Sequence, residues 1–256
     1  MAATPPDLLD RAMRAQGDLA AAARILPLVD LTSLGDDDAE AQVESLCARA
    51  IDAGVAAVCV WPRFVPLVKA RLAHSPIRVA TVANFPDGSD DLARVARETG
   101  DALATGADEV DVVAPIQAVV EGDIGLLTEL VQACKKEAPD VTLKVILETG
   151  RLQQPARIAA AARAAIMGGC DMLKTSTGRF PLGATLEAAA VLLALLEEAD
   201  GRVGIKFAGG IRTTQQAAQY LYLVDHFLGS VWTSPETLRF GATALLHDLL
   251  KILRSE

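Results

Sequence analysis

Two lysines lie inside short apolar runs that follow one another along the chain. Lys174 is part of residues 171–176 and Lys206 is part of residues 202–208, and each run ends in small residues and glycine. Lysine is almost never fully buried without a partner or a task. A strand-end lysine whose ammonium group reaches water is the ordinary alternative, but its repetition in the next run argues against that interpretation. A buried amine with a lowered pKa can attack a carbonyl carbon and form a Schiff base.

Two further charged residues have the same position within their runs. Asp111 and Lys144 each lie in an apolar run upstream of the two lysines, and Glu109 lies two positions before Asp111. Alternate residues of a strand point to the same face, and in a closed barrel one such set points inward. We therefore expect these side chains to share one interior with Lys174 and Lys206. The alternative is a buried ion-pair network without chemistry, which is an expensive way to fill a core.

The proximity of a second lysine would lower the pKa of the first. Two ammonium groups about 4 Å apart repel by about 4 kcal/mol at an effective dielectric constant near 20. That repulsion corresponds to about three pKa units and would bring a lysine from about 10.4 to near 7, and desolvation acts in the same direction. We expect Lys174 to be the neutral nucleophile, Lys206 the perturbing cation, and Asp111 part of a proton relay. An iminium on Lys174 would accept electrons, so that a neighbouring carbon–carbon bond could break without a cofactor.

Glycine-rich turns after the predicted strands offer places for a phosphate group. A Gly-Gly pair follows the run that contains Lys206, and Gly-Ala-Thr precedes the last helix. Phosphate sites in barrels use these two places, because backbone N–H groups and the amino end of a helix attract anions. A glycine and an arginine after the run of Lys174 add a backbone nest and a charge. The predicted phosphate site comprises Gly178, Arg179, Gly209, Gly210, Gly241 and Thr243.

Eight apolar runs alternate with eight amphipathic segments, and a first helix is expected over Pro5–Ala23, within an N-terminal extension of residues 1–25. Eight strand–helix units without a linker predict an α/β fold, a single (β/α)8 TIM barrel over residues 1–256 whose first helix caps one end. A doubly wound open sheet is the alternative. Residues 31–35, after the first run, lack the glycine-rich phosphate fingerprint of that fold.

The bounds of the eight units follow from the change between apolar and amphipathic pattern. We expect Asp36–Asp38 to cap the first helix of these units and Thr213 to cap the seventh. The predicted strands are Leu26–Thr32, Ala57–Trp61, Arg78–Asn84, Glu109–Ala114, Thr142–Glu148, Asp171–Ser176, Arg202–Ala208 and Leu238–Gly241. The predicted helices are Asp38–Ala53, Phe64–Ala73, Asp90–Thr105, Asp123–Glu137, Pro155–Met167, Thr185–Glu198, Thr213–Phe227 and Thr243–Leu253.

The composition limits the classes of function. The chain has 256 residues, of which 51% are hydrophobic, 22% charged and 4% aromatic, and its formal net charge is −9. An acidic chain with few aromatic side chains lacks the surface of a nucleic-acid-binding protein. Four cysteines without metal-ligand spacing predict the reduced thiols of a cytoplasmic protein. No run has the length of a membrane span or the pattern of a signal peptide, and we expect neither a metal nor another cofactor.

Six motifs lie in or next to these runs: residues 28–32 (LVDLT), 58–64 (VCVWPRF), 84–88 (NFPDG), 108–113 (DEVDVV), 173–178 (LKTSTG) and 205–212 (IKFAGGIR). Together they resemble the signature strands of the deoxyribose-phosphate aldolase family, over about residues 26–253. The resemblance implies a class I aldolase of deoxyribonucleoside catabolism that splits 2-deoxy-D-ribose 5-phosphate reversibly into acetaldehyde and D-glyceraldehyde 3-phosphate. It implies small phosphosugar and aldehyde substrates and, as family members are often dimers, a homodimer as one expected assembly.

The resemblance also assigns roles to single residues. Lys174 matches the lysine that forms the Schiff base, Lys206 matches the second lysine that tunes it, and Asp111 matches the aspartate of the proton relay. The residues that match the family's substrate pocket are Asp30, Lys144 and Thr175.

Four features depart from the family pattern. One is the C-terminus, residues 253–256, which lacks the tail ending in tyrosine that some members use in proton transfer and so bears on protonation of the enamine. Phe207 replaces a proline that is common beside the second lysine, Arg179 replaces a lysine, and Thr243-Ala244 replaces two serines. The last two changes fall in the expected phosphate site and bear on phosphate affinity rather than on the reaction. Two other functions are open at this point: a phosphosugar isomerase that uses a carboxylate base, and a barrel that binds a phosphosugar without catalysis.

Overall fold

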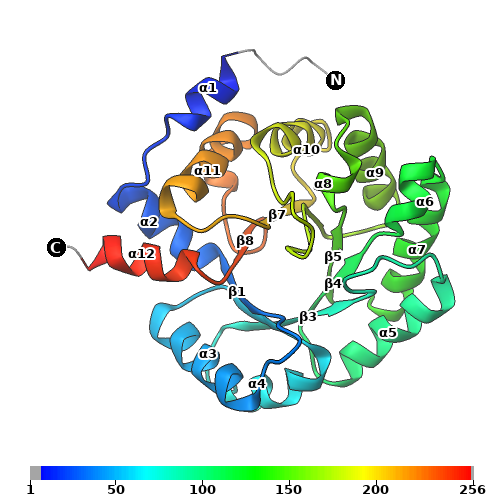
Figure 1. The fold of residues 1–256 in the computed structure, drawn as a ribbon, viewed down its shortest axis with the longest axis horizontal. Coiled ribbons are helices and arrows are strands. Elements are labelled where there is room, and N and C mark those ends of the chain that lie inside the picture. Colours follow the sequence, from blue (N-terminus) through cyan, green and yellow to red (C-terminus); the bar gives the residue numbers. More distant parts are fainter. Residues whose placement is uncertain (1–6, 255–256) are drawn as a thin grey trace.

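Eight parallel strands form a closed barrel, in which each strand is hydrogen-bonded to the next and β8 returns to β1. The structure is a computed structural model that describes residues 7–254. Figure 1 shows the ring of strands end-on, with the helices outside it. The predicted barrel is confirmed and the open sheet is excluded. The strands are β1 (Val29–Ser33), β2 (Ala57–Val60), β3 (Arg78–Ala83), β4 (Glu109–Val113), β5 (Thr142–Ile146), β6 (Met172–Lys174), β7 (Gly204–Ala208) and β8 (Leu238–Ala242).

One long helix follows each strand and covers the outside of the barrel. Five shorter helical segments were not predicted, because three to six residues are too few to show a helical period. The long helices are α3 (Glu40–Ala53), α4 (Val65–Arg71), α5 (Leu92–Ala104), α7 (Ile124–Glu137), α9 (Pro155–Met167), α10 (Leu186–Glu198), α11 (Thr214–Leu228) and α12 (Leu245–Leu253). The short ones are α6 (Ile116–Glu121), α8 (Thr149–Leu152), η1 (Leu26–Leu28), η2 (Pro62–Phe64) and η3 (Ser230–Trp232).

The chain before the barrel forms two helices, α1 (Leu8–Met13) and α2 (Leu19–Ile25), rather than the single helix expected over Pro5–Ala23. The first two residues of that prediction lie outside the described residues. The helix is interrupted near Gly17, whose backbone N–H donates to Oε1 of Gln215 at 2.8 Å. A Cβ at Gly17 would lie 2.4 Å from the backbone nitrogen of Gln215. The close contact with α11 therefore sets where the helix breaks, and both pieces lie at the outer edge of the ring (Figure 1).

The expected cap at Asp36–Asp38 is wrong, because the N-cap residue of α3 is Ala39. Asp38 instead accepts a hydrogen bond from the backbone N–H of Gly35 and closes the loop after β1. Thr213 does cap α11, since its side chain accepts a hydrogen bond from the third residue of the helix. Short polar side chains before a helix can serve either the helix or the preceding loop, and the sequence pattern does not distinguish the two.

The two faces of the strands differ in chemistry. On β7, Lys206 points into the barrel while its neighbour Phe207 points outward into the helix layer. The Phe207 ring centroid lies 4.8 Å from that of Tyr220 on α11 and 6.0 Å from that of Phe240 on β8. The larger core thus lies between the barrel and its helices, whereas the interior holds the charged side chains together with a small apolar cluster of Cys59, Ala80 and Val82. Within residues 7–254, no helix is both long and apolar enough to cross a membrane.

We predict that Phe207→Ala lowers the free energy of unfolding by about 3–5 kcal/mol, because the fully buried ring leaves a cavity in the core. Chemical denaturation measures this change. The control is Val231→Ala, a truncation at a side chain that is 97% exposed, for which the expected change is within about 0.5 kcal/mol. Equal losses in the two variants would contradict the assignment of Phe207 to the core.

Candidate active site

Asp111 on β4 is the centre of a cluster of buried charges inside the barrel. Its Oδ2 accepts hydrogen bonds from Nζ of Lys174 at 2.8 Å and from Nζ of Lys206 at 2.7 Å. Its Oδ1 accepts one from Nζ of Lys144 at 2.9 Å. The structure therefore brings together the four residues that the strand period places inside the barrel: Asp111, Lys144, Lys174 and Lys206. None of the four is more than 2% exposed.

The strand register explains why these side chains meet. Asp111 pairs with Lys144 across β4 and β5, and Lys174 pairs with Lys206 across β6 and β7. Paired residues of neighbouring parallel strands point to the same side of the sheet. In a closed barrel that side is the interior, so long lysine side chains from β5, β6 and β7 can reach one carboxylate on β4.

Three further charges complete the cluster. Asp30 on β1 forms ion pairs with Lys206 at 2.6 Å and with Arg239 on β8 at 2.6 Å. Arg239 also pairs with Glu109 at 2.8 Å, and Glu109 pairs with Lys144 at 2.5 Å. A closed circuit of ion pairs therefore runs around the inside of the barrel.

Sequence reasoning missed Arg239, although a signal was present. It stands two positions before Gly241 in the eighth apolar run, so it is in phase with a residue expected at the interior. That run has four residues and a weak strand pattern, so the sequence gives little indication of the direction of its side chains. Glu109 was in phase with Asp111, and the structure shows that it is an interior partner of a lysine.

The environment separates the three lysines. Burial lowers the pKa of Lys174, the carboxylate of Asp111 opposes this, and the charge of Lys206 adds to the lowering, so that the result lies below the ordinary value. Burial also lowers the pKa of Lys206, but Asp111 and Asp30 outweigh it and raise that pKa above the ordinary value. For Lys144, Asp111 and Glu109 outweigh burial in the same way. The charge of Lys206 thus helps to lower the pKa of Lys174, as expected, but desolvation is the larger cause. Lys174 is the lysine that most readily loses its proton.

The carboxylate at the centre stays charged. Burial by itself raises the pKa of Asp111, but Lys144, Lys174 and Lys206 outweigh it and hold that pKa well below the ordinary value. A carboxylate in this state is a weak base and a strong electrostatic partner. It suits a group that stabilises positive charge on a neighbouring nitrogen.

A cavity of about 430 Å³ lies at the carboxyl ends of the strands, above the cluster. Of the seven charged residues in the cluster, Lys174 is the one that lines it. Asp30 and Lys144, expected in the substrate pocket, lie deeper in the barrel and reach this cavity through their contacts with other charged groups. The six residues predicted to hold a phosphate all line it: Gly178, Arg179, Gly209, Gly210, Gly241 and Thr243.

Three of these glycines are required by the backbone. Gly178, Gly209 and Gly210 have φ values of 79°, 89° and 88°, which side-chain-bearing residues rarely adopt. Gly183 packs directly against this turn, and a Cβ there would lie 2.3 Å from the carbonyl oxygen of Gly209. The loops after β6 and β7 are therefore pressed together at the wall of the cavity.

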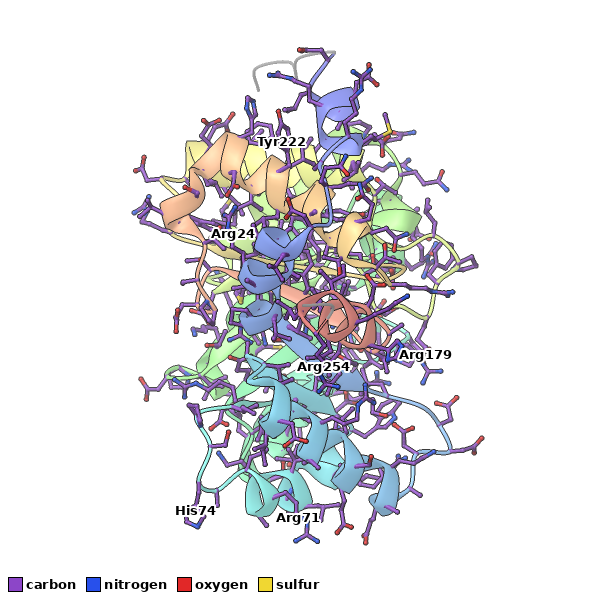
Figure 2. All side chains as sticks on the ribbon, turned by 90° about the vertical axis from the view of Figure 1, so that its left-hand side faces the viewer. Arg24, Arg71, His74, Arg179, Tyr222 and Arg254 are labelled. Carbon is purple, nitrogen blue, oxygen red and sulfur yellow. The ribbon has the colours of Figure 1, made fainter. Side chains whose placement is uncertain are left out.

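Arg179 does not have a free guanidinium group. It forms an ion pair with Asp36 at 2.8 Å and also donates to the backbone carbonyl of Leu34, which joins the loop after β6 to the loop after β1. Figure 2 shows Arg179 and His74 at opposite ends of the barrel. Arg212 was not predicted as a site residue, although it follows the Gly-Gly pair closely. It is exposed, lines the cavity, and forms no ion pair with another residue of the described range.

Thr175 does not reach the cavity. Its hydroxyl donates to the carbonyl oxygen of Ala208 and accepts from the N–H of the same residue, at 3.0 and 2.9 Å, and so ties β6 to β7. Thr175 is next to the inward-pointing Lys174 and is therefore out of phase with the interior. Glu148, buried with a φ of 51°, accepts hydrogen bonds from the backbone and hydroxyl of Thr177. Glu148 thus holds the turn that carries Gly178.

The chain matches known proteins over most of its length. Residues 24–226 match the model of a family described as DeoC/LacD family aldolase. A crystal structure of a putative deoxyribose-phosphate aldolase from Toxoplasma gondii ME49 has 27% identity and a TM-score of 0.87, and the match covers 94% of this chain and 97% of that one. Two structures below 25% identity share the fold. They are a putative deoxyribose-phosphate aldolase from Coccidioides immitis (24% identity, TM-score 0.80) and a tetrameric deoxyribose phosphate aldolase from Aeropyrum pernix (22%, TM-score 0.76), each match covering 98% of this chain and 99% of the other.

The family match spans the strands that carry the three lysines and Asp111, and the similarity in structure extends over nearly all of the barrel. The site has a buried amine at the floor of a cavity whose wall is rich in glycine, which is an arrangement suited to carbonyl chemistry on a small substrate. On the match of its sequence, this chain belongs to the DeoC/LacD family of aldolases.

Proposed function

We propose that the chain is a class I aldolase that cleaves 2-deoxy-D-ribose 5-phosphate reversibly to D-glyceraldehyde 3-phosphate and acetaldehyde through a Schiff base on Lys174. The observation that carries this proposal is the position of Lys174. It is the lysine of the cluster whose pKa is lowered, and it is also the one that lines the cavity. The names of the matching aldolase structures support the choice of substrate.

The contacts of the three lysines explain why Lys174 is the nucleophile. Lys206 lies against two carboxylates, Asp30 and Asp111, and Lys144 lies against Glu109 and Asp111 and, at 4.0 Å, Asp30. Lys174 has one carboxylate neighbour, which it shares with both other lysines. A proton is therefore held least firmly on Lys174.

The cleavage begins when the neutral Nζ of Lys174 attacks C1 of the open-chain sugar and water is lost to form an iminium ion. The proton of the C3 hydroxyl is removed and the C2–C3 bond breaks, so that its electron pair moves into the iminium and leaves an enamine. D-glyceraldehyde 3-phosphate departs. Protonation of the enamine at C2 and hydrolysis then release acetaldehyde and the free amine.

The buried cluster stabilises the charges that form during these reaction steps. The carboxylate of Asp111 lies against the nitrogen that carries positive charge in the iminium, and it forms one station of the proton relay. Lys206 and Lys144 remain cationic, because each is held by two carboxylates. Their charges keep the resting amine of Lys174 neutral, and they orient Asp111 from both of its oxygen atoms.

The phosphate group binds at the far wall of the cavity. Backbone N–H groups of the turn at Gly209 and Gly210 are available there, together with the side chain of Arg212 and the start of α12 beyond Thr243. Arg179 contributes less than expected, because Asp36 already neutralises its charge.

The two alternative functions fit the site less well. An isomerase that works by proton transfer alone needs a carboxylate base in contact with substrate. Here the central carboxylate of Asp111 is bound by three lysine side chains and does not line the substrate cavity. A barrel that only binds a phosphosugar has no use for a desolvated amine, which costs stability to bury.

We place the reaction in the cytoplasm and in the catabolism of deoxyribonucleosides. The four cysteines are buried and unpaired, as is usual for proteins in reducing compartments. The homodimer remains an expectation.

We predict that borohydride, added with deoxyribose 5-phosphate, gives a permanent mass increase on the peptide that carries Lys174. The variant Lys174→Ala should lose this increase and at least about 1000-fold of the activity, because the covalent route requires the amine. Mass spectrometry of a digest measures the label. Lys136→Ala, which removes an exposed lysine on α7, should label as the unaltered chain does. A label that persists in a folded Lys174→Ala variant would refute the assignment.

We predict that Lys206→Met lowers kcat by about tenfold or more at pH 7, and that the loss shrinks as the pH rises. Removal of the cation raises the pKa of Lys174, and one pKa unit is tenfold in the fraction of neutral amine below that pKa. At higher pH the solvent removes the proton instead. The pH profile of kcat measures this effect, and a reduced kcat with an unchanged profile would speak against the tuning role of Lys206.

We predict that Arg212→Met raises KM for deoxyribose 5-phosphate by about 10–100-fold, since a charge-assisted hydrogen bond contributes about 1.5–3 kcal/mol. KM for unphosphorylated deoxyribose should stay the same. Arg179→Met is the matched comparison and should have the smaller effect, because its guanidinium is bound by Asp36. Steady-state kinetics with both sugars measure the difference, and the reverse order of the two variants would show that Arg179 exchanges partners when substrate binds.

A further inference from the structure

The charges inside the barrel do not balance if every group is ionised. In this cluster three carboxylates face four cations, and all seven residues are at most 4% exposed. An unbalanced charge in such a desolvated site is costly, and the group that can change its protonation state does so. The carboxylates are Asp30, Glu109 and Asp111, and the cations are Lys144, Lys174, Lys206 and Arg239.

The ion pairs show which cations are matched to the carboxylates. Arg239 contacts Asp30 at 2.6 Å and Glu109 at 2.8 Å, and an arginine does not lose its proton in a protein. Lys206 contacts two carboxylates, Asp30 and Asp111, and Lys144 contacts Glu109 and Asp111 closely and Asp30 at 4.0 Å. These three cations, each with at least two carboxylate contacts, thus neutralise the three carboxylates. Lys174 is the fourth cation, and its single carboxylate partner, Asp111, is shared with both other lysines.

We propose that Arg239 is a positioning residue whose permanent charge completes the neutralisation of the three carboxylates and thereby leaves Lys174 as the uncharged amine. Without Arg239, two lysines would face three carboxylates, and the remaining negative charge would hold a proton on Lys174. This inference rests on the proposed Schiff base at Lys174 and explains what keeps that amine reactive.

Arg239 acts at a distance from the substrate. It does not line the substrate cavity but, with Glu109, lines a second cavity of about 360 Å³ at the amino ends of the strands, next to Arg78, Asp171 and Glu236. Its influence reaches Asp111 by two routes of ion pairs. One runs through Asp30 and Lys206, and the other runs through Glu109 and Lys144.

The other strands add no charged side chain next to Lys174. β2 contributes Cys59, whose pKa burial raises, so its thiol is neutral at physiological pH. β3 contributes Ala80 and Val82, which pack against Cys59 in the interior. A further buried carboxylate, that of Glu148 after β5, accepts hydrogen bonds from Thr177 and forms no ion pair with another residue of the described range. The seven charged groups joined by ion pairs are therefore the set that acts most directly on Lys174.

The test is the pH dependence of imine formation in four variants. The chain is incubated with acetaldehyde and cyanoborohydride, and the rate of mass increase on the Lys174 peptide is followed from acid to alkaline pH. Arg239→Met should raise the pKa of Lys174 and so move the acid limb of this profile to higher pH by about one unit or more. At a given pH on that limb, the rate should then be about tenfold lower. Glu109→Gln removes a negative charge, which should lower the pKa of Lys174 and move the acid limb to lower pH.

Two further variants separate charge from geometry. Arg239→Lys keeps the positive charge and should leave the limb near that of the unaltered chain. The double variant Glu109→Gln/Arg239→Met loses one charge of each sign, so its limb should return toward the starting position. A role of Arg239 in structure alone would lower stability in these variants without moving their limbs in opposite directions.

The control for the loss of an arginine ion pair is Arg24→Met. Arg24 binds both carboxylate oxygens of Asp225 at 2.7 Å in the outer helix layer (Figure 2), and its loss should not move the limb. If Arg239→Met does not fold, the inference still requires the downward shift of Glu109→Gln and the unchanged limb of Arg239→Lys.

Three results would overturn this inference. An unshifted limb in folded Arg239→Met, or shifts of Arg239→Met and Glu109→Gln in the same direction, would overturn the inference alone. Absence of any label on Lys174 in the unaltered chain would overturn the proposed Schiff base, and this inference with it.

Discussion

The structure depends on one carboxylate shared by three amines in a space from which water is excluded. Asp111 has two oxygen atoms and accepts hydrogen bonds from the amines of Lys144, Lys174 and Lys206. In bulk water such an arrangement would have little effect, because solvent screens each charge. In the barrel the desolvation of the amines and their competition for one counter-charge make the three lysines chemically different.

The barrel is suited to this arrangement because it separates apolar packing from charge. The core that stabilises the fold lies between strands and helices, where Phe207, Tyr220 and Phe240 pack together. The interior is therefore free to hold a cluster that contributes little to stability by itself. The closed ring of strands also leaves no edge at which water could approach these charges along the sheet.

The sequence was sufficient to predict the barrel, because eight apolar runs alternate with eight amphipathic segments. It was also sufficient to predict the convergence of the charged side chains, because that follows from the period of two along each strand. It was insufficient where a side chain has several partners within reach. Arg239 belongs to a short run with a weak strand pattern, so its inward direction was not recognised. Asp36 was expected at a helix start, but it binds Arg179 across the mouth of the cavity. Contacts of that kind join residues 143 positions apart, and no local pattern reports them.

The cavity meets the charge cluster at a single side chain, that of Lys174. The residues that we propose for substrate recognition are on the loops at the carboxyl ends of the strands, whereas the charged residues around Asp111 lie below them. Substitutions at the rim of the cavity, at Arg179 or Thr243 for example, therefore change its lining without altering the ion pairs below. In the proposed aldolase, substrate preference can thus diverge while the basicity of the amine is retained.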